Sequence, residues 1–332
     1  MRRLLVIVCC GLGFAVPAAA DGAGGPVPAQ QLGAGVSAPG SDLAYVAVGA
    51  GRSTVIERLR RSDGTVERSR LLHGVFGVPG VAYDGSTTGL AAESGTLVLA
   101  ELTRVYPVRH TRLVLLSASS LRPRARISLR GWYTVDAISP YGRWLYLIHY
   151  RSVSNTNRYE VRAYDLRARR LVTKPVIDPR EPDEKMQGLP LTRVMSADGR
   201  WAYTLYQRPD DAPFIHALDT QHRTAACIDL DGVSDADISE AHLTLADGGA
   251  TLRVAGPGAP LALVDTRTFK VRRPAPASAP APAPARQAPA RRAAASDDGG
   301  GVPWELAFVA LVPLAALGVL VRRRRGAALR GH

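Results

Sequence analysis

The chain has 332 residues, a formal net charge of +13 and three cysteines. Residues 21–272 hold 31 lysines and arginines against 26 acidic residues, a balance of +5, so most of the excess charge lies near the two ends. The arginines of this central part are scattered singly without interleaved aromatic residues, so we do not expect nucleic acid as a partner. Only Cys227 lies outside the leading apolar segment, which excludes a fold held by internal disulfides.

The first twenty residues have the layout of a secretory signal peptide. Arg2 and Arg3 precede an apolar run from Leu4 to Val16, and three alanines end the segment before Asp21. This run is too short for a comfortable membrane span. We therefore expect residues 1–20 to be a signal peptide and residues 21–39 to be a flexible segment ahead of the folded body.

Residues 40–273 contain a repeated motif. The segments "SPYGRWLYLI" (139–148) and "SADGRWAYTLY" (196–206) match closely, and "LTLADGGATLRVA" (243–255) is a third copy. Weaker copies are "VAYDGSTTGLAAE" (81–93) and "SAPGSDLAYVAVG" (37–49), and the spacing of about 45 to 57 residues is close to that of propeller blades. Asp-Gly between two alternating apolar runs indicates a tight hairpin in which both turn residues adopt positive φ.

A second strand pair follows each motif. The segments 159–176, 214–230 and 261–274 share an apolar alternation, an aspartate, a turn and a further apolar run, and 113–129 has the same outline with Ser117 in place of the aspartate. Asp165, Asp219 and Asp265 fall at equivalent points, where a carboxylate can bond the backbone of its own turn. Motif and strand pair together predict one four-stranded blade.

The C-terminal region predicts a tethered protein. Residues 274–301 are rich in alternating proline and alanine, which form an extended, semi-rigid stalk. Residues 302–321 form an apolar run that as a helix would span about 30 Å, and Arg322–Arg325 follow it. A positive cluster marks the cytoplasmic side. We expect a single-pass protein of the cell membrane with an extracytoplasmic body, a transmembrane helix at 302–321 and a basic cytoplasmic tail at 322–332.

The motifs "SADGRWAYTLY" and "SPYGRWLYLI" resemble the hairpins of bacterial β-propellers of the WD40-like, TolB-like and YVTN type, and "HALDT" and "RAYDL" resemble the outer strands of those families. The resemblance covers about residues 40–273 and implies an all-β propeller of about five four-stranded blades, with six or seven as the alternative count. It does not imply one function, because these families include binding scaffolds and lactonases. The competing fold is a β-sandwich.

Candidate site residues lie in two irregular segments. The connection 177–193 supplies Glu181, Asp183, Glu184, Lys185 and Arg193, which we predict as a ligand-binding rim because loops carry function more often than strands do. The acidic run "DLDGVSDADISE" resembles a calcium loop, but Val233 and Ser234 stand where a ligand and a glycine are required. A looser calcium site is the metal prediction, and its ligands would be Asp229, Asp231, Asp235 and Asp237.

No catalytic signature is present in the sequence. The seven histidines do not cluster, and HExxH, GxSxG, P-loop and CxxC motifs are absent. We therefore expect a binding or scaffolding module that recognises an envelope protein, a glycan or a small ligand, without a catalytic residue or an obligatory cofactor. The alternative is a propeller enzyme, either lactonase-like or another metal-assisted hydrolase.

Overall fold

The computed structural model describes residues 25–103, 105, 108–183, 186–208 and 211–274. The predicted signal peptide, the predicted transmembrane helix, the basic tail and all but the first residue of the stalk lie outside these residues. Within the described part of the chain, no helix combines the length and apolar character that a membrane span requires.

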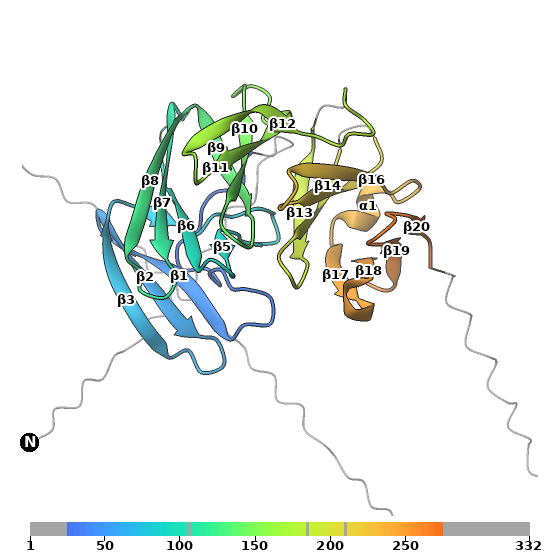
Figure 1. The fold of residues 1–332 in the computed structure, drawn as a ribbon. Coiled ribbons are helices and arrows are strands. Elements are labelled where there is room, and N and C mark those ends of the chain that lie inside the picture. Colours follow the sequence, from blue (N-terminus) through green and yellow to red (C-terminus); the bar gives the residue numbers. More distant parts are fainter. Residues whose placement is uncertain (1–24, 104, 106–107, 184–185, 209–210, 275–332) are drawn as a thin grey trace, which may run out of the picture. The chain divides into compact units, whose positions relative to one another are not determined.

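The described residues form twenty β-strands in five antiparallel sheets, which follow one another in chain order (Figure 1). The first sheet comprises β1 (Leu43–Ala50), β2 (Ser53–Arg60) and β3 (Val66–His73). The second comprises β4 (Phe76–Gly77), β5 (Leu90–Ala91), β6 (Thr96–Glu101), β7 (His110–Ser117) and β8 (Pro123–Arg130). The third comprises β9 (Trp132–Ile138), β10 (Trp144–Tyr150), β11 (Tyr159–Asp165) and β12 (Arg170–Val176).

The last two sheets have four strands each. The fourth comprises β13 (Leu189–Met195), β14 (Trp201–Gln207), β15 (Phe214–Asp219) and β16 (Thr224–Asp229). The fifth comprises β17 (His242–Ala246), β18 (Thr251–Ala255), β19 (Pro260–Asp265) and β20 (Val271–Arg272). The short helix α1 (Asp235–Ile238) connects the fourth and fifth sheets, and the 3₁₀ turn η1 (Asp247–Gly249) lies between β17 and β18.

Hydrophobic cores fill the spaces between consecutive sheets, because alternate residues of a strand point to opposite faces. In β6, Leu97 and Leu99 pack with Ile56 of the first sheet, whereas Val98 packs with Leu145 of the third. In β14, Ala202 likewise faces the third sheet and Tyr203 faces the fifth. Sheets stacked in this order are blades of a β-propeller, not the two facing layers of a β-sandwich.

Residues 25–39 belong to the folded body, although the sequence placed them outside it. Val27 and Val36 are buried, and Val36 exchanges backbone hydrogen bonds with Tyr45 of β1 at 3.0 and 2.9 Å. Gln30 does the same with Val78, which directly follows β4 of the second sheet, at 2.7 and 2.9 Å. The segment therefore supplies the inner edge of the first sheet and ties that sheet to the second.

The repeated motifs form the hairpin between the first two strands of a blade, as predicted. Gly142 and Gly199 have φ of 67° and 69°, in the left-handed region that favours glycine. Tyr141 and Asp198 do not have positive φ, so the expectation that both turn residues are left-handed is wrong here. In the second sheet the corresponding turn follows Ala91, so the Asp84-Gly85 pair that the sequence proposed is not this hairpin.

The second hairpin of each blade is tied by the residue that the sequence identified. The Asp165 carboxylate accepts hydrogen bonds from the backbone N–H groups of Arg167 and Ala168 at 2.9 and 2.8 Å. Asp219 and Asp265 do the same in their own turns, and Ser117 accepts from Ser120 N–H at 3.4 Å. Four residues after each of them the backbone is left-handed, at Leu121, Arg169, Arg223 and Phe269.

We expect Arg169→Gly to stabilise the protein by up to about 1 kcal/mol, because a left-handed residue with a Cβ costs about that much more than glycine. Arg169 has φ of 53° and is exposed. Urea unfolding of Arg169→Gly and Arg169→Ala checks this, since both variants remove the charge and only glycine relieves the strain. Equal stability of the two variants would contradict the expectation.

Candidate functional site

The structure separates the residues that were predicted to form a ligand-binding rim. Glu181 and Asp183 are exposed in the connection between β12 and β13. Arg193 lies in β13 with its side chain only 3% exposed, so it is an interior residue and not part of a surface rim. Glu184 and Lys185 lie outside the described residues. Ligand binding by this set stays a prediction.

Arg193 joins the third and fourth sheets. Its guanidinium donates to the carboxylate and to the backbone oxygen of Asp136 in β9, and its Nε donates to Thr204 Oγ1 at 2.8 Å. The Asp136 side chain is 1% exposed. Buried charges are tolerated when they are paired and hydrogen-bonded, and Arg193 has such a partner inside the protein.

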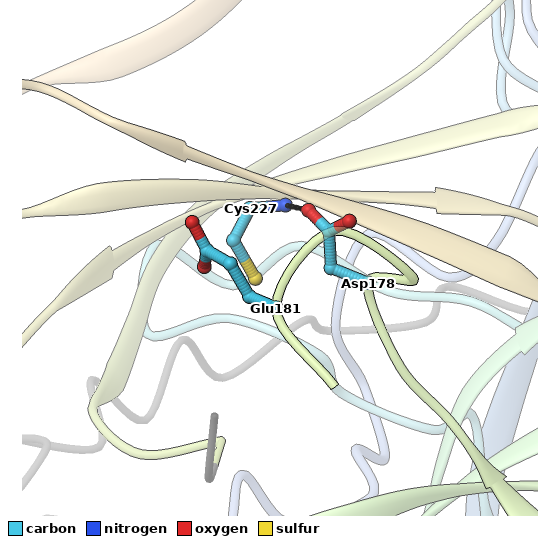
Figure 2. Close-up of side chains that lie close together, drawn as sticks. All are labelled: Asp178, Glu181 and Cys227. Carbon is cyan, nitrogen blue, oxygen red and sulfur yellow. Dashed lines mark hydrogen bonds between the residues drawn. The ribbon is translucent and has the colours of Figure 1, made fainter. Parts of the chain in front are cut away.

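Glu181 does lie close to two other potential metal ligands. Its carboxylate, the Asp178 carboxylate and the Cys227 thiol have one ligand atom each within 4.8 Å of one another (Figure 2). Asp178 and Glu181 come from the β12–β13 connection, and Cys227 comes from β16. A thiolate with carboxylates is a ligand set that zinc accepts.

Arg180 already occupies the Asp178 carboxylate, however. Its guanidinium donates to both oxygens at 2.5 to 3.1 Å and to Cys227 O at 2.9 Å. Cys227 N–H donates to the same carboxylate at 2.8 Å (Figure 2). Burial raises the pKa of Asp178, but these hydrogen bonds outweigh it and hold the pKa below its usual range. We therefore interpret this cluster as a set of hydrogen bonds that holds the β12–β13 connection against β16.

The four predicted calcium ligands do not form one cluster. Asp229 accepts from Arg208 Nη1 at 2.9 Å. Asp237 accepts from Ser234 Oγ at 2.7 Å and completes the capping box of α1. Asp231 and Asp235 are exposed. Within the described part of the chain, no three of these four carboxylates come together as the group around Cys227 does.

A wide hollow lies elsewhere, at the turn ends of the fourth and fifth sheets. It is a cleft of about 1060 Å³ between three hairpins, β13–β14, β17–β18 and β19–β20, with Pro39 at its border. Ligand pockets typically measure about 300–1,000 Å³, so its size suits a small molecule or part of a polymer. A smaller hollow of about 180 Å³ adjoins it and shares Pro39, Met195, Ala197 and Asp198.

Aromatic rings and charged groups line this cleft. The ring of Trp201 stacks with Tyr203 at 6.1 Å between centroids and meets Phe269 edge-on at 5.3 Å. The Arg200 guanidinium lies 5.2 Å from the centroid of the Trp201 ring. Further polar groups complete the lining, from Asp198, Thr244, Asp247, Thr266 and Arg267.

Asp219 fixes the position of Arg200. Its carboxylate is 2% exposed and accepts from Arg200 Nε at 3.0 Å and Nη2 at 2.6 Å, with His222 Nδ1 at 3.0 Å. Burial raises the pKa of this carboxyl, but the hydrogen bonds from Arg200 and His222 outweigh it and lower the pKa. The carboxylate that ties the turn of β15 and β16 therefore also holds the arginine beside Trp201.

Sequence reasoning did not find this cleft. It placed the motif 196–206 in a hairpin, and Trp201 and Tyr203 do lie in β14, directly after that turn. The hollow arises because the β13–β14 hairpin meets two hairpins of the next sheet, more than forty residues further along the chain.

The comparisons with known proteins concern the fold of this chain and do not identify a family. No family model matches the chain, and no curated protein matches its sequence. Similar solved structures include TolB from Acinetobacter baumannii, with 12% identity and a TM-score of 0.40 over 71% of this chain and 54% of TolB. Another is the β-propeller domain of Cps50 (Swd1) from Myceliophteria thermophila, with 11% identity and a TM-score of 0.38 over 73% of this chain and 66% of that domain.

A third similar structure is a protein of Bacteroides uniformis provisionally described as a 6-phosphogluconolactonase. It has 14% identity and a TM-score of 0.39 over 70% of this chain and 67% of that protein. This chain thus spans about half the length of TolB and two thirds of the other two. At these identities the likeness concerns the β-propeller fold alone.

Proposed function

We propose that this chain is a membrane-tethered, extracytoplasmic β-propeller that binds a glycan of the cell envelope in the cleft beside Trp201. The predicted signal peptide, stalk and apolar C-terminal run support the location. The proposal rests on the cleft, because the cleft combines a large volume with aromatic rings and charged side chains in its lining.

The lining suits a sugar better than a purely apolar ligand. A pyranose ring presents C–H groups on its faces and hydroxyl groups at its edge, so an aromatic ring can pack on a face while charged groups bond the edge. Trp201 and Phe269 supply apolar ring surface. Asp198 and Arg200 lie on the same hairpin and supply an acceptor and donors for hydroxyl groups.

We propose recognition as the function because the aromatic and charged lining suits a saccharide ring, and the proposal gives the carboxylates of Asp198 and Asp247 a binding role.

Trp201→Ala is expected to weaken glycan binding about ten- to hundredfold, because truncating a central aromatic residue removes most of the stacking energy. Tryptophan fluorescence and calorimetric titration of the full-length protein with N-acetylhexosamine tetrasaccharides measure this. Trp201→Phe, which retains an aromatic face, should bind with intermediate affinity.

The matched control is Tyr141→Ala. Tyr141 is 71% exposed and precedes the corresponding glycine of the third sheet, outside the cleft lining. Its loss should leave the affinity unchanged. Absence of saccharide binding by the wild-type protein, or equal affinity of Trp201→Ala and wild type, would overturn the proposal.

A further inference from the structure

Six arginines gather on the second and third sheets without acidic partners. Three lie at or near β8, two lie in the turn between β11 and β12, and one is the first residue of β12; this arginine surface comprises Arg122, Arg124, Arg126, Arg167, Arg169 and Arg170. All six are exposed. Among the described residues, no carboxylate forms an ion pair with any of them.

A small pocket marks the place where the two groups meet. It measures about 180 Å³, lies between β8 and the β11–β12 turn, and has Arg124, Arg126 and Arg169 in its lining together with Tyr164. The guanidinium of Arg124 donates only to neutral oxygens, Ser94 O at 3.4 Å and Thr96 Oγ1 at 3.3 Å. That of Arg126 lies 5.6 Å from the Phe76 ring centroid, so its contact is with an aromatic ring and not with a carboxylate.

The nearest acidic residue of the turn is already engaged. Asp165 accepts from the backbone of Arg167 and Ala168, and its other oxygen lies 3.9 Å from Arg143 Nη2. The corresponding turn of the first sheet differs, since Arg60 there pairs with Asp63 at 3.2 Å and Glu67 at 3.0 Å. The lack of acidic partners is therefore a property of this surface and not of all the outer turns.

Uncompensated guanidinium groups in one region raise the local potential and attract anions. The planar fork of arginine matches phosphate oxygens in pairs. Arg122, Arg167 and Arg170 lie outside the pocket lining, so the exposed charge is not confined to a site for one phosphate, which favours a linear polymer over an isolated ion. The pocket's only aromatic residue is Tyr164, whose side chain is buried, so the surface offers no platform for stacking nucleobases.

We propose that the arginine surface binds a linear phosphate-bearing polymer, with one phosphate group seated in the pocket beside Arg124 and Arg169. Binding depends on the charge and the spacing of the phosphate groups and not on nucleobases. This site is separate from the cleft beside Trp201 and does not depend on the glycan proposal.

The exposed arginines also have an alternative, purely structural explanation. Positive residues on an outer edge strand such as β8 also prevent sheets of different molecules from pairing. On that explanation, removing the arginines would cause self-association and would leave phosphate polymer binding unchanged. The two explanations therefore predict different measurements.

The test titrates full-length protein with inorganic polyphosphate of defined chain length. Calorimetry at several salt concentrations measures the binding constant. Arg124→Ala/Arg126→Ala/Arg169→Ala should weaken binding about a hundredfold, at roughly fivefold per arginine. It should also reduce the slope of log K against log salt by about 2, if each arginine contacts one phosphate. The triple lysine variant at the same positions should retain most of the affinity.

The matched control is Arg58→Ala/Arg60→Ala/Arg112→Ala, which removes the same charge from arginines that pair with carboxylates. It should bind nearly as wild type does, so equal weakening of both triple variants would overturn the proposal. Unchanged binding of the first triple variant, with or without self-association, would overturn it as well. Arginine-dependent binding to phosphatidylglycerol vesicles or single-stranded DNA, but not to polyphosphate, would replace the proposed partner with a lipid surface or a nucleic acid.

Discussion

Asp136→Ala is expected to destabilise the protein by about 3–5 kcal/mol, because it leaves the guanidinium of Arg193 buried without its counter-charge. Both side chains are at most 3% exposed, and besides Asp136 the Arg193 side chain donates to Thr204 Oγ1 among the described residues. The pair joins β9 to β13, so its loss affects the contact between the third and fourth sheets. Urea unfolding followed by circular dichroism measures the change.

The double variant Asp136→Leu/Arg193→Met separates the cost of an unpaired charge from the value of the pair. Replacing both partners by apolar residues of similar volume is often neutral, so this variant should recover most of the lost stability. If Asp136→Ala does not fold, Asp136→Asn provides a milder variant on the same scale. A loss below 1 kcal/mol for Asp136→Ala would show that water or another group solvates Arg193.

The parts of the fold that the sequence predicted correctly are those fixed by neighbouring residues. Asp165 and Asp219 were assigned to their turns because an aspartate bonds the backbone two residues on, and this needs no knowledge of distant strands. Gly142 and Gly199 were placed in hairpins for the same local reason. Repetition of these local signals also indicated several four-stranded sheets, although the copy at 81–93 was misplaced.

The parts that could not be predicted depend on residues far apart in the chain. Asp136 and Arg193 are 57 residues apart, and nothing in either segment indicates that the two side chains meet between sheets. Arg193 was instead grouped with Glu181 because both belong to one long connection. The cleft has the same origin, since Trp201 and Phe269 belong to different sheets whose turn ends converge.

Asp219→Asn is expected to destabilise the protein by about 2–3 kcal/mol at pH 7, since it removes the charge from a buried group that accepts from Arg200 and His222. The folded-state pKa of Asp219 is lower than its usual value of about 3.9. The carboxylate therefore contributes its stability above that value, and the contribution is lost as the pH falls through the folded-state pKa. The difference in the free energy of unfolding between wild type and Asp219→Asn should therefore decrease below pH 4, as urea unfolding measures.

Asp165→Asn is the matched control, because Asp165 holds the equivalent turn of the third sheet but has its arginine, Arg143, 3.9 Å away. A smaller loss is expected there, and equal losses would contradict a special role for the Arg200 contact. Asp219→Asn should also weaken saccharide binding, because Arg200 loses the partner that holds it beside Trp201. A variant that loses stability but binds saccharide as wild type does would show that Trp201 recognises its ligand without Arg200.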